Sequence, residues 1–221
     1  MQRCWWCGVT LVELVIVMVV TGILFVTTPP LLFHGVKTMV FLPKALAVNH
    51  VATEVLHQIV EGGFSILQTT PARGLRFANR TLPTGGSSVQ PAIWLAEDKR
   101  IGFLTADGQY ILIRLDDTVV NNEVITRSFP PTSSTCSSSF ASLTPENIPY
   151  HAQGSVRILP TVRLFRYYNQ SGLEVNNPWS CPPPSTIRRV DIAFRAQTGT
   201  GNFDEGNARE DITSSVAIRV P

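Results

Sequence analysis

The first hydrophobic pattern is a run of apolar and small residues from Val9 to Val26 that contains one charged position, Glu13. As a helix these roughly 18 residues would extend about 27 Å, which is close to the hydrocarbon thickness of a bilayer. An ionisable side chain inside such a segment is costly and usually functional. The pattern therefore predicts a membrane-spanning helix over residues 9–28 with a functional carboxylate one turn inside it.

A second, amphipathic pattern occupies residues 29–68. Pro29 and Pro30 are expected to kink or break the helix where it leaves the membrane. From Ala45 onward, apolar residues recur at spacings of three and four, which predicts a helix with one buried face. The glycines at 62 and 63 indicate where it stops. The residues expected on the buried face are Val48, Val51, Ala52, Val55 and Ile59.

The pattern changes to short alternating runs, separated by Gly, Pro, Ser and Asn, in residues 69–221. This change predicts antiparallel strands, with turns at Ala106–Gly108 and Asn169–Gly172. The expected fold class is thus α+β: a long N-terminal transmembrane helix that continues into an amphipathic helix packed on an antiparallel β-sheet head. The expected strands are Ala92–Glu97, Ile101–Leu104, Tyr110–Leu115, Glu123–Ser128, Thr161–Tyr168, Arg188–Arg195 and Ile212–Val220.

The chain carries little net charge. The chain of 221 residues has a formal net charge of +2, which is not the strong basic bias of a nucleic-acid-binding protein. Without the membrane helix, about 190 residues remain, enough for one core. No internal repeat is present.

Gly8, followed by the apolar run with Glu13 five positions later, resembles the processing and methylation signature of the type IV pilin superfamily. The resemblance implies that residues 1–8 are a leader, which the prepilin peptidase removes after Gly8. It also implies N-methylation of Val9 and pairing of Glu13 with the charged N-terminus of a neighbouring subunit. Arg3 is the one basic residue of this leader, and Val9 replaces the usual Phe or Met. A plain signal anchor that tolerates Glu13 is the alternative.

Downstream segments resemble the J-type minor pseudopilins of type II secretion and the PilW-type minor pilins. This resemblance implies a minor subunit, anchored once in the bacterial inner membrane with a periplasmic head. Such a subunit assembles with other minor subunits and the major subunit to initiate or cap a pseudopilus or pilus. Asn169 replaces an acidic residue that is usual after the paired tyrosines, so the subgroup stays open. The matching segments are Ala106–Ile111, Ile125–Arg127, Leu164–Asn169 with Gly172, Ile187–Ile192 and Ser214–Arg219.

The four cysteines divide between two expected compartments. Cys136 and Cys181 would both lie in an oxidising periplasm, so we expect a disulfide between them, closing a loop of about 45 residues and worth about 4 kcal/mol. Two separate thiols are the alternative. Cys4 and Cys7 form a Cys-x-x-Cys spacing within the leader, without a second pair beside it.

No catalytic constellation is recognisable, and the chain is expected to be neither an enzyme nor a cofactor-binding protein. Gly-x-Ser-x-Gly does not occur in the sequence. Two pairs of adjacent carboxylates, Asp116–Asp117 and Glu210–Asp211, adjoin expected strands, where neighbouring side chains point to opposite faces. The alternative function is a singly anchored periplasmic binding or enzymatic protein whose N-terminus matches the pilin motif by chance.

Two sets of residues are weak metal candidates. His50, Glu54 and His57 would share one helix face, and Asp204 with Glu205 lies in a loop that could bind calcium. The favoured interpretation of both is a solvated polar surface, because no further ligands are apparent. Five exposed arginines could likewise form a stripe for nucleic acid or for an acidic protein partner, of which the protein partner is favoured. More often such arginines only keep a sheet surface solvated and its edges protected. The five are Arg163, Arg166, Arg188, Arg189 and Arg195.

Overall fold

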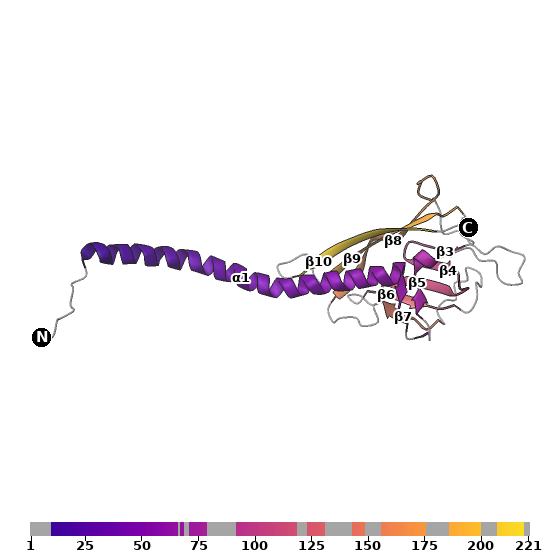
Figure 1. The fold of residues 1–221 in the computed structure, drawn as a ribbon, viewed down its shortest axis with the longest axis horizontal. Coiled ribbons are helices and arrows are strands. Elements are labelled where there is room, and N and C mark those ends of the chain that lie inside the picture. The colour runs from indigo at the N-terminus through magenta and orange to yellow at the C-terminus, as the bar shows by residue number, and fades with distance from the viewer. Residues whose placement is uncertain are drawn as a thin grey trace, which may run out of the picture. The chain divides into compact units, whose positions relative to one another are not determined.

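The computed structural model describes residues 10–65, 67–68, 71–78, 92–118, 123–130, 143–148, 156–175, 186–199 and 207–218. Within these residues, a long helix is followed by short strands and a 3-10 turn and then by two antiparallel sheets (Figure 1). The chain divides into two units, Met1–Pro43 and Lys44–Pro221. The α+β class expected from the sequence is confirmed.

Helix α1 runs from Leu11 to Val60, a length of 50 residues, with three prolines inside it. The expected break at Pro29 and Pro30 is therefore wrong. Each proline removes one backbone donor, but the surrounding hydrogen bonds keep the chain helical, as is common in apolar helices. The turn before the prolines gains side-chain hydrogen bonds, because Thr27 Oγ1 donates to the Ile23 carbonyl (3.0 Å) and Thr28 Oγ1 to that of Leu24 (2.7 Å).

The membrane-length part of α1 is apolar and exposed. Its side chains from Leu11 to Leu42 are predominantly hydrophobic, and all of them are exposed. By length and composition α1 is the one helix in the described residues that could cross a membrane. This is consistent with a single-pass anchor.

The part of α1 beyond Pro43 packs into the head through one face. Val48, Val51, Ala52, Val55 and Ile59 are all buried, as the spacing of apolar residues predicts. The helix ends at Val60, just before the two glycines predicted to stop it and short of the expected segment limit near Gln68, because Gly62 has a φ of 88° that side-chain-bearing residues rarely adopt. The glycines that follow form β1 (Gly62–Gly63), which pairs with β2 (Ala72–Arg73).

A five-stranded sheet contains the middle of the chain, in the order β3-β4-β5-β6-β7. Its first four strands match the expected ones within one residue at each end. The fifth, β7, is not predicted by the sequence because three residues are too short to show an alternating pattern. The strands are β3 (Ile93–Ala96), β4 (Arg100–Leu104), β5 (Tyr110–Asp116), β6 (Val124–Ser128) and β7 (Glu146–Ile148).

A three-stranded sheet contains the C-terminal part, in the order β10-β9-β8, with β8 at Val156–Tyr168, β9 at Arg189–Thr198 and β10 at Arg209–Ala217. All three strands were expected. β8 begins earlier than predicted, since it continues through a register shift between Pro160 and Phe165. β9 alternates strictly between buried and half-buried side chains, which gives the sheet one face toward the core.

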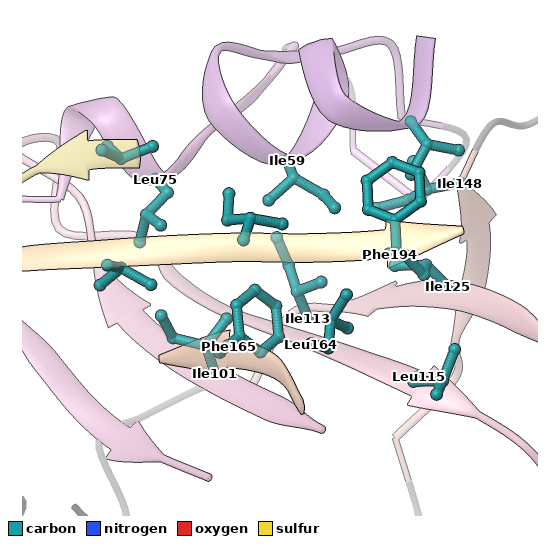
Figure 2. Close-up of a cluster of buried hydrophobic side chains, with 14 of the residues drawn as sticks. Ile59, Leu75, Ile101, Ile113, Leu115, Ile125, Ile148, Leu164, Phe165 and Phe194 are labelled. Atoms are coloured by element: carbon teal, nitrogen blue, oxygen red, sulfur yellow. The ribbon is translucent and has the colours of Figure 1, made fainter. Parts of the chain in front are cut away.

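The core of the head is shared by the helix, the 3-10 turn η1 (Leu75–Phe77) and both sheets (Figure 2). Ile59 of α1 and Leu75 of η1 have no exposed surface, and neither have Ile113 of β5, Phe165 of β8 and Phe194 of β9. A smaller second cluster on the five-stranded sheet is formed by Trp94, Leu95, Leu104 and Leu112. The helix end, η1 and strands of both sheets thus share the main cluster, and the chain from Lys44 onward forms one compact unit.

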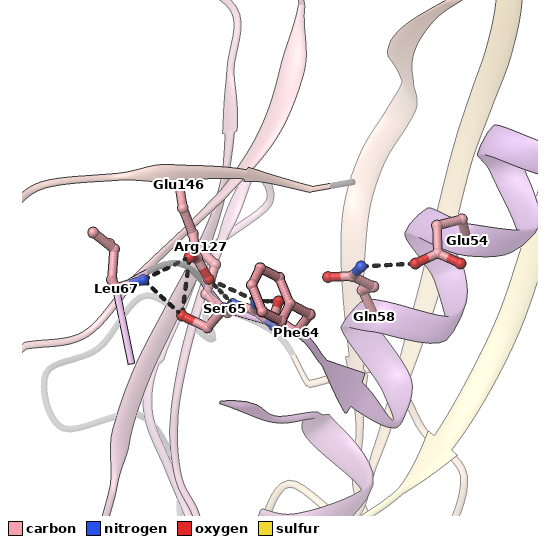
Figure 3. A network of polar contacts seen from close by, with 7 residues as sticks. All are labelled: Glu54, Gln58, Phe64, Ser65, Leu67, Arg127 and Glu146. Atoms are coloured by element: carbon pink, nitrogen blue, oxygen red, sulfur yellow. Dashed lines mark hydrogen bonds and ion pairs between the residues drawn. The ribbon is translucent and has the colours of Figure 1, made fainter. Parts of the chain in front are cut away.

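A buried ion pair ties the segment after α1 to the five-stranded sheet (Figure 3). Arg127 of β6 donates through Nε to Glu146 Oε1 of β7 (2.6 Å), and both side chains are only 2% exposed. Arg127 Nη2 also donates to the Phe64 carbonyl (2.7 Å), and Ser65 Oγ donates to Glu146 Oε2 (2.9 Å). The pair thus satisfies backbone and side-chain groups of the segment that leaves the helix.

A second polar contact connects the two sheets. The buried Tyr167 hydroxyl on β8 shares its one proton between the carbonyls of Glu97 (2.9 Å) and Arg100 (3.2 Å) at the β3–β4 turn, and accepts from the Glu97 amide (3.1 Å). Burial is the largest influence on the hydroxyl and raises the pKa of Tyr167 well above its ordinary value. The side chain is therefore a neutral hydrogen-bonding group between the sheets.

Candidate assembly site at the start of the helix

Thr10 and Glu13 form a reciprocal pair at the first turn of α1. The Glu13 amide donates to Thr10 Oγ1 (3.3 Å), while Glu13 Oε2 accepts from the Thr10 amide (3.1 Å) and from Thr10 Oγ1 (3.2 Å). Thr10 immediately precedes the helix, so it occupies the N-cap position and Glu13 the third helical position. This is a capping box, which satisfies amides that have no partner inside the helix.

The sequence interpretation missed this local role of Glu13. The signal was present, since Thr10-x-x-Glu13 before an apolar run is the sequence pattern of a capping box. The carboxylate also lies where the positive end of the helix dipole stabilises a negative charge. Glu13 therefore has a structural role within its own chain, and its role between subunits stays a prediction.

The surroundings of Glu13 are apolar and uncovered. Leu11, Val12, Leu14 and Ile16 each expose half or more of their surface. Within the described residues, Glu13 makes no ion pair, and Oε1 accepts no hydrogen bond, since both Thr10 contacts go to Oε2. One carboxylate oxygen thus remains available to a group supplied from outside this part of the chain.

Several predicted site residues lie outside the described residues: Gly8 and Val9 of the processing site, Cys136 and Cys181 of the expected disulfide, and the calcium candidates Asp204 and Glu205. The cleavage, the methylation, the disulfide and the calcium site stay predictions.

The histidine candidates on α1 do not form a metal site in the described part of the chain, where no group of three or more potential ligands is close enough to hold an ion. Glu54 instead accepts a hydrogen bond from Gln58 Nε2 (2.7 Å) on the same helix (Figure 3). The i, i+4 spacing that suggested a ligand pair is here used by a glutamate and a glutamine.

The adjacent carboxylates act separately, as their places on strands predict. Asp116 accepts from the amide and hydroxyl of Thr118, and these hydrogen bonds lower its pKa. Asp117 pairs with Lys99. The hydrogen bond from Arg195 is the largest influence that lowers the pKa of Asp211, and Arg209 adds to it.

The expected arginine stripe is largely paired with acids. Arg163 contacts Glu174 (2.8 Å) and Asp98 (3.4 Å), and Arg195 contacts Asp211 (2.6 Å). These pairs are partly exposed, so each contributes little to stability. They do reduce the positive potential that a nucleic-acid surface would need.

Comparison with known proteins adds no assignment: no protein-family model, curated protein or solved structure matches the chain. The fold and the site define an α+β protein with one apolar N-terminal helix, whose first turn carries a carboxylate.

Proposed function

We propose that the chain is a minor subunit of a type II secretion pseudopilus or a type IV pilus. In this proposal, the prepilin peptidase removes residues 1–8, and the remaining chain is held in the bacterial inner membrane by the first part of α1, with its head in the periplasm. The partners are other minor subunits and the major subunit. The observation that carries the proposal is Glu13, a carboxylate on an uncovered apolar helix directly after a Gly8-Val9 junction.

The geometry of the first helical turn supports a pairing role. Because Thr10 holds Oε2, the Glu13 side chain is oriented before any partner arrives. A charged amine from a neighbouring subunit could then contact Oε1. Two opposite charges in an apolar environment offset much of each other's desolvation, whereas either charge alone costs several kcal/mol. Pairing of this kind would set the register between subunits.

The head supports the same proposal in a more general way. Several of its exposed charged side chains are paired, such as Arg163 with Asp98 and Arg195 with Asp211. An assembly role needs a folded body joined to an apolar helix, and the described residues contain a packed β-rich unit and one such helix. We propose that the head contacts neighbouring subunits and carries no catalytic activity.

The capping box makes a sharp experiment possible, because its two residues separate charge from structure. Glu13→Gln keeps an acceptor for the Thr10 groups but removes the charge, and Gln is accepted at this position of a capping box. Thr10→Ala weakens the cap and leaves the charge. Glu13→Leu removes both. Each full-length variant would be expressed in a host with its own assembly machinery, and its co-purification with partner subunits compared with wild type.

We expect Glu13→Gln and Glu13→Leu to enter the membrane and be processed but to lose co-purification, while Thr10→Ala retains it. If Glu13→Gln co-purifies as well as wild type, charge pairing is rejected. If only Thr10→Ala and Glu13→Leu fail, Glu13 acts through the helix cap alone.

A further inference from the structure

A surface hollow of about 550 Å³ lies where the turn after β8 meets the start of β9 and the end of β10. Its described lining includes no residue of the first helical turn, and it plays no part in the proposed pairing of Glu13. Its lining residues are Asn169, Gln170, Gly172, Arg188, Arg189 and Ile218.

The wall of this hollow is fixed by backbone hydrogen bonds. The Arg188 amide donates to the Tyr168 carbonyl (2.8 Å), and the Ile218 amide donates to the Arg188 carbonyl (2.7 Å). In the turn, Asn169 Oδ1 accepts from the amides of Ser171 (2.9 Å) and Leu173 (3.0 Å). With the side-chain oxygen of Asn169 used in this way, its Nδ2 group is the part that can serve a ligand, as a donor.

Arg189 is held in position at the edge of the hollow. Its guanidinium lies over the Tyr168 ring, 4.1 Å from the centroid, and its Nε is 3.0 Å from Asp191 Oδ1. Asp191 also accepts from Ser215 Oγ (2.7 Å), so its charge is shared. The Arg189 side chain remains 42% exposed. Such restraint reduces the entropy that the side chain would lose on binding a ligand.

The sign of the charge distinguishes this hollow from two others on the head. One of about 680 Å³ is lined by acids and bases together, including Asp98, Asp116 and Arg114. Another of about 740 Å³ is lined by Glu61 and Asp107 as well as Arg73. Among the described residues, the lining of the hollow at Arg189 has two arginines and two amide side chains and no carboxylate.

We propose that this hollow binds a carboxylate, an aspartate or glutamate side chain, of a partner polypeptide. Guanidinium groups match a carboxylate with two parallel hydrogen bonds, and the amide of Asn169 adds a donor. The volume exceeds that of one carboxylate, so it accommodates the side chain together with adjoining peptide. A single carboxylate is favoured over a continuous chain of phosphates, because Asp191 contacts Arg189 and offsets part of the positive charge that a polyanion would need.

The test uses the full-length chain in detergent and the immobilised peptide acetyl-Ser-Gly-Glu-Gly-Ser-amide, with Gln in place of Glu as the paired probe. We expect retention by the Glu peptide and at least about tenfold less by the Gln peptide. Arg189→Gln should lower retention by the Glu peptide to the level of the Gln peptide, and Arg189→Lys should retain part of it. Arg195→Gln is the matched control, because Arg195 is on the same strand and pairs with Asp211 outside the hollow.

Equal retention by the two peptides would overturn the proposal, as would wild-type binding by Arg189→Gln. A decamer of deoxythymidine provides a further arm: if it binds more tightly than the Glu peptide and depends on Arg189, the hollow is a phosphate site instead. Thermal unfolding of each variant shows whether it folds. The inference does not require the pilin assignment, so failure of Glu13 pairing leaves it standing.

Discussion

Thr10 and Glu13 satisfy each other across the first turn of α1, with Glu13 Oε2 accepting two hydrogen bonds and the Glu13 amide donating one back. The same carboxylate is the one charge within the apolar run that precedes the prolines. A residue that caps its own helix and pairs with a neighbour would couple the order of the helix start to assembly. The two roles predict different outcomes for substitutions that remove the charge and substitutions that remove the cap.

Processing gives the first prediction. Gly8→Leu should leave the leader attached, since a bulky side chain at the cleavage position would not fit a peptidase that accepts a small residue there. Val9→Phe restores the more usual residue of the resembled family and should be cleaved. Intact mass and N-terminal sequence of protein isolated from a host with a working peptidase distinguish the cleaved chain from the chain that keeps its leader. Normal maturation of Gly8→Leu would count against the assignment to the pilin pathway.

The buried ion pair gives a prediction about stability. Glu146→Leu should lower the free energy of unfolding by about 3–5 kcal/mol, because it leaves the buried Arg127 charge without its partner. The double variant Arg127→Met, Glu146→Leu should lose much less, since an apolar pair of similar volume removes both charges. Urea unfolding in detergent, followed by near-ultraviolet circular dichroism, measures both values. If the double variant is as unstable as Glu146→Leu, the loss of stability does not come from the unpaired Arg127 charge, and the ion pair itself stabilises the fold.

Tyr167 gives a prediction about the contact between the sheets. Tyr167→Phe keeps the ring but removes the hydroxyl that reaches the carbonyls of Glu97 and Arg100. We expect a loss of about 1–3 kcal/mol in the free energy of unfolding, because buried polar groups lose a partner. Tyr168→Phe, on the half-buried neighbouring position, is the control and should change stability little. If Tyr167→Phe leaves the free energy of unfolding unchanged, the carbonyls of Glu97 and Arg100 must find other hydrogen-bond donors.

Asp211 gives a prediction about pH. Its pKa in the folded chain lies below the ordinary value of 3.8, chiefly through the hydrogen bond from Arg195. The stabilisation is therefore complete above about pH 4 and is lost as the pH falls through the lowered pKa. The difference in unfolding free energy between wild type and Asp211→Asn should shrink as the pH is lowered from 5 to about 2. A constant difference would show that the Arg195 contact is not electrostatic. The effect is small, because half of the carboxylate side chain is exposed.

Much of the fold was predictable because periodicity is a local property. The buried face of α1 from Val48 to Ile59 and the strands β3 to β6 follow from spacings within a few residues. The alternation of apolar and polar residues in β9 likewise predicted which face of the strand lies toward the core. Neither required knowledge of distant partners, since a helix or strand repeats its own geometry.

Other features exist only because distant segments meet. Arg127 and Glu146 lie on different strands, and nothing near either residue in the sequence indicates that they pair. The hollow at Arg189 likewise combines a turn, a strand start and a strand end. For the candidate assembly site, the amino-acid sequence alone determined a carboxylate in an apolar segment, together with the local Thr10-x-x-Glu13 pattern. Tertiary structure decided which acids the arginines contact and which arginines line a hollow, because the energy of a charge depends on the groups that folding places around it.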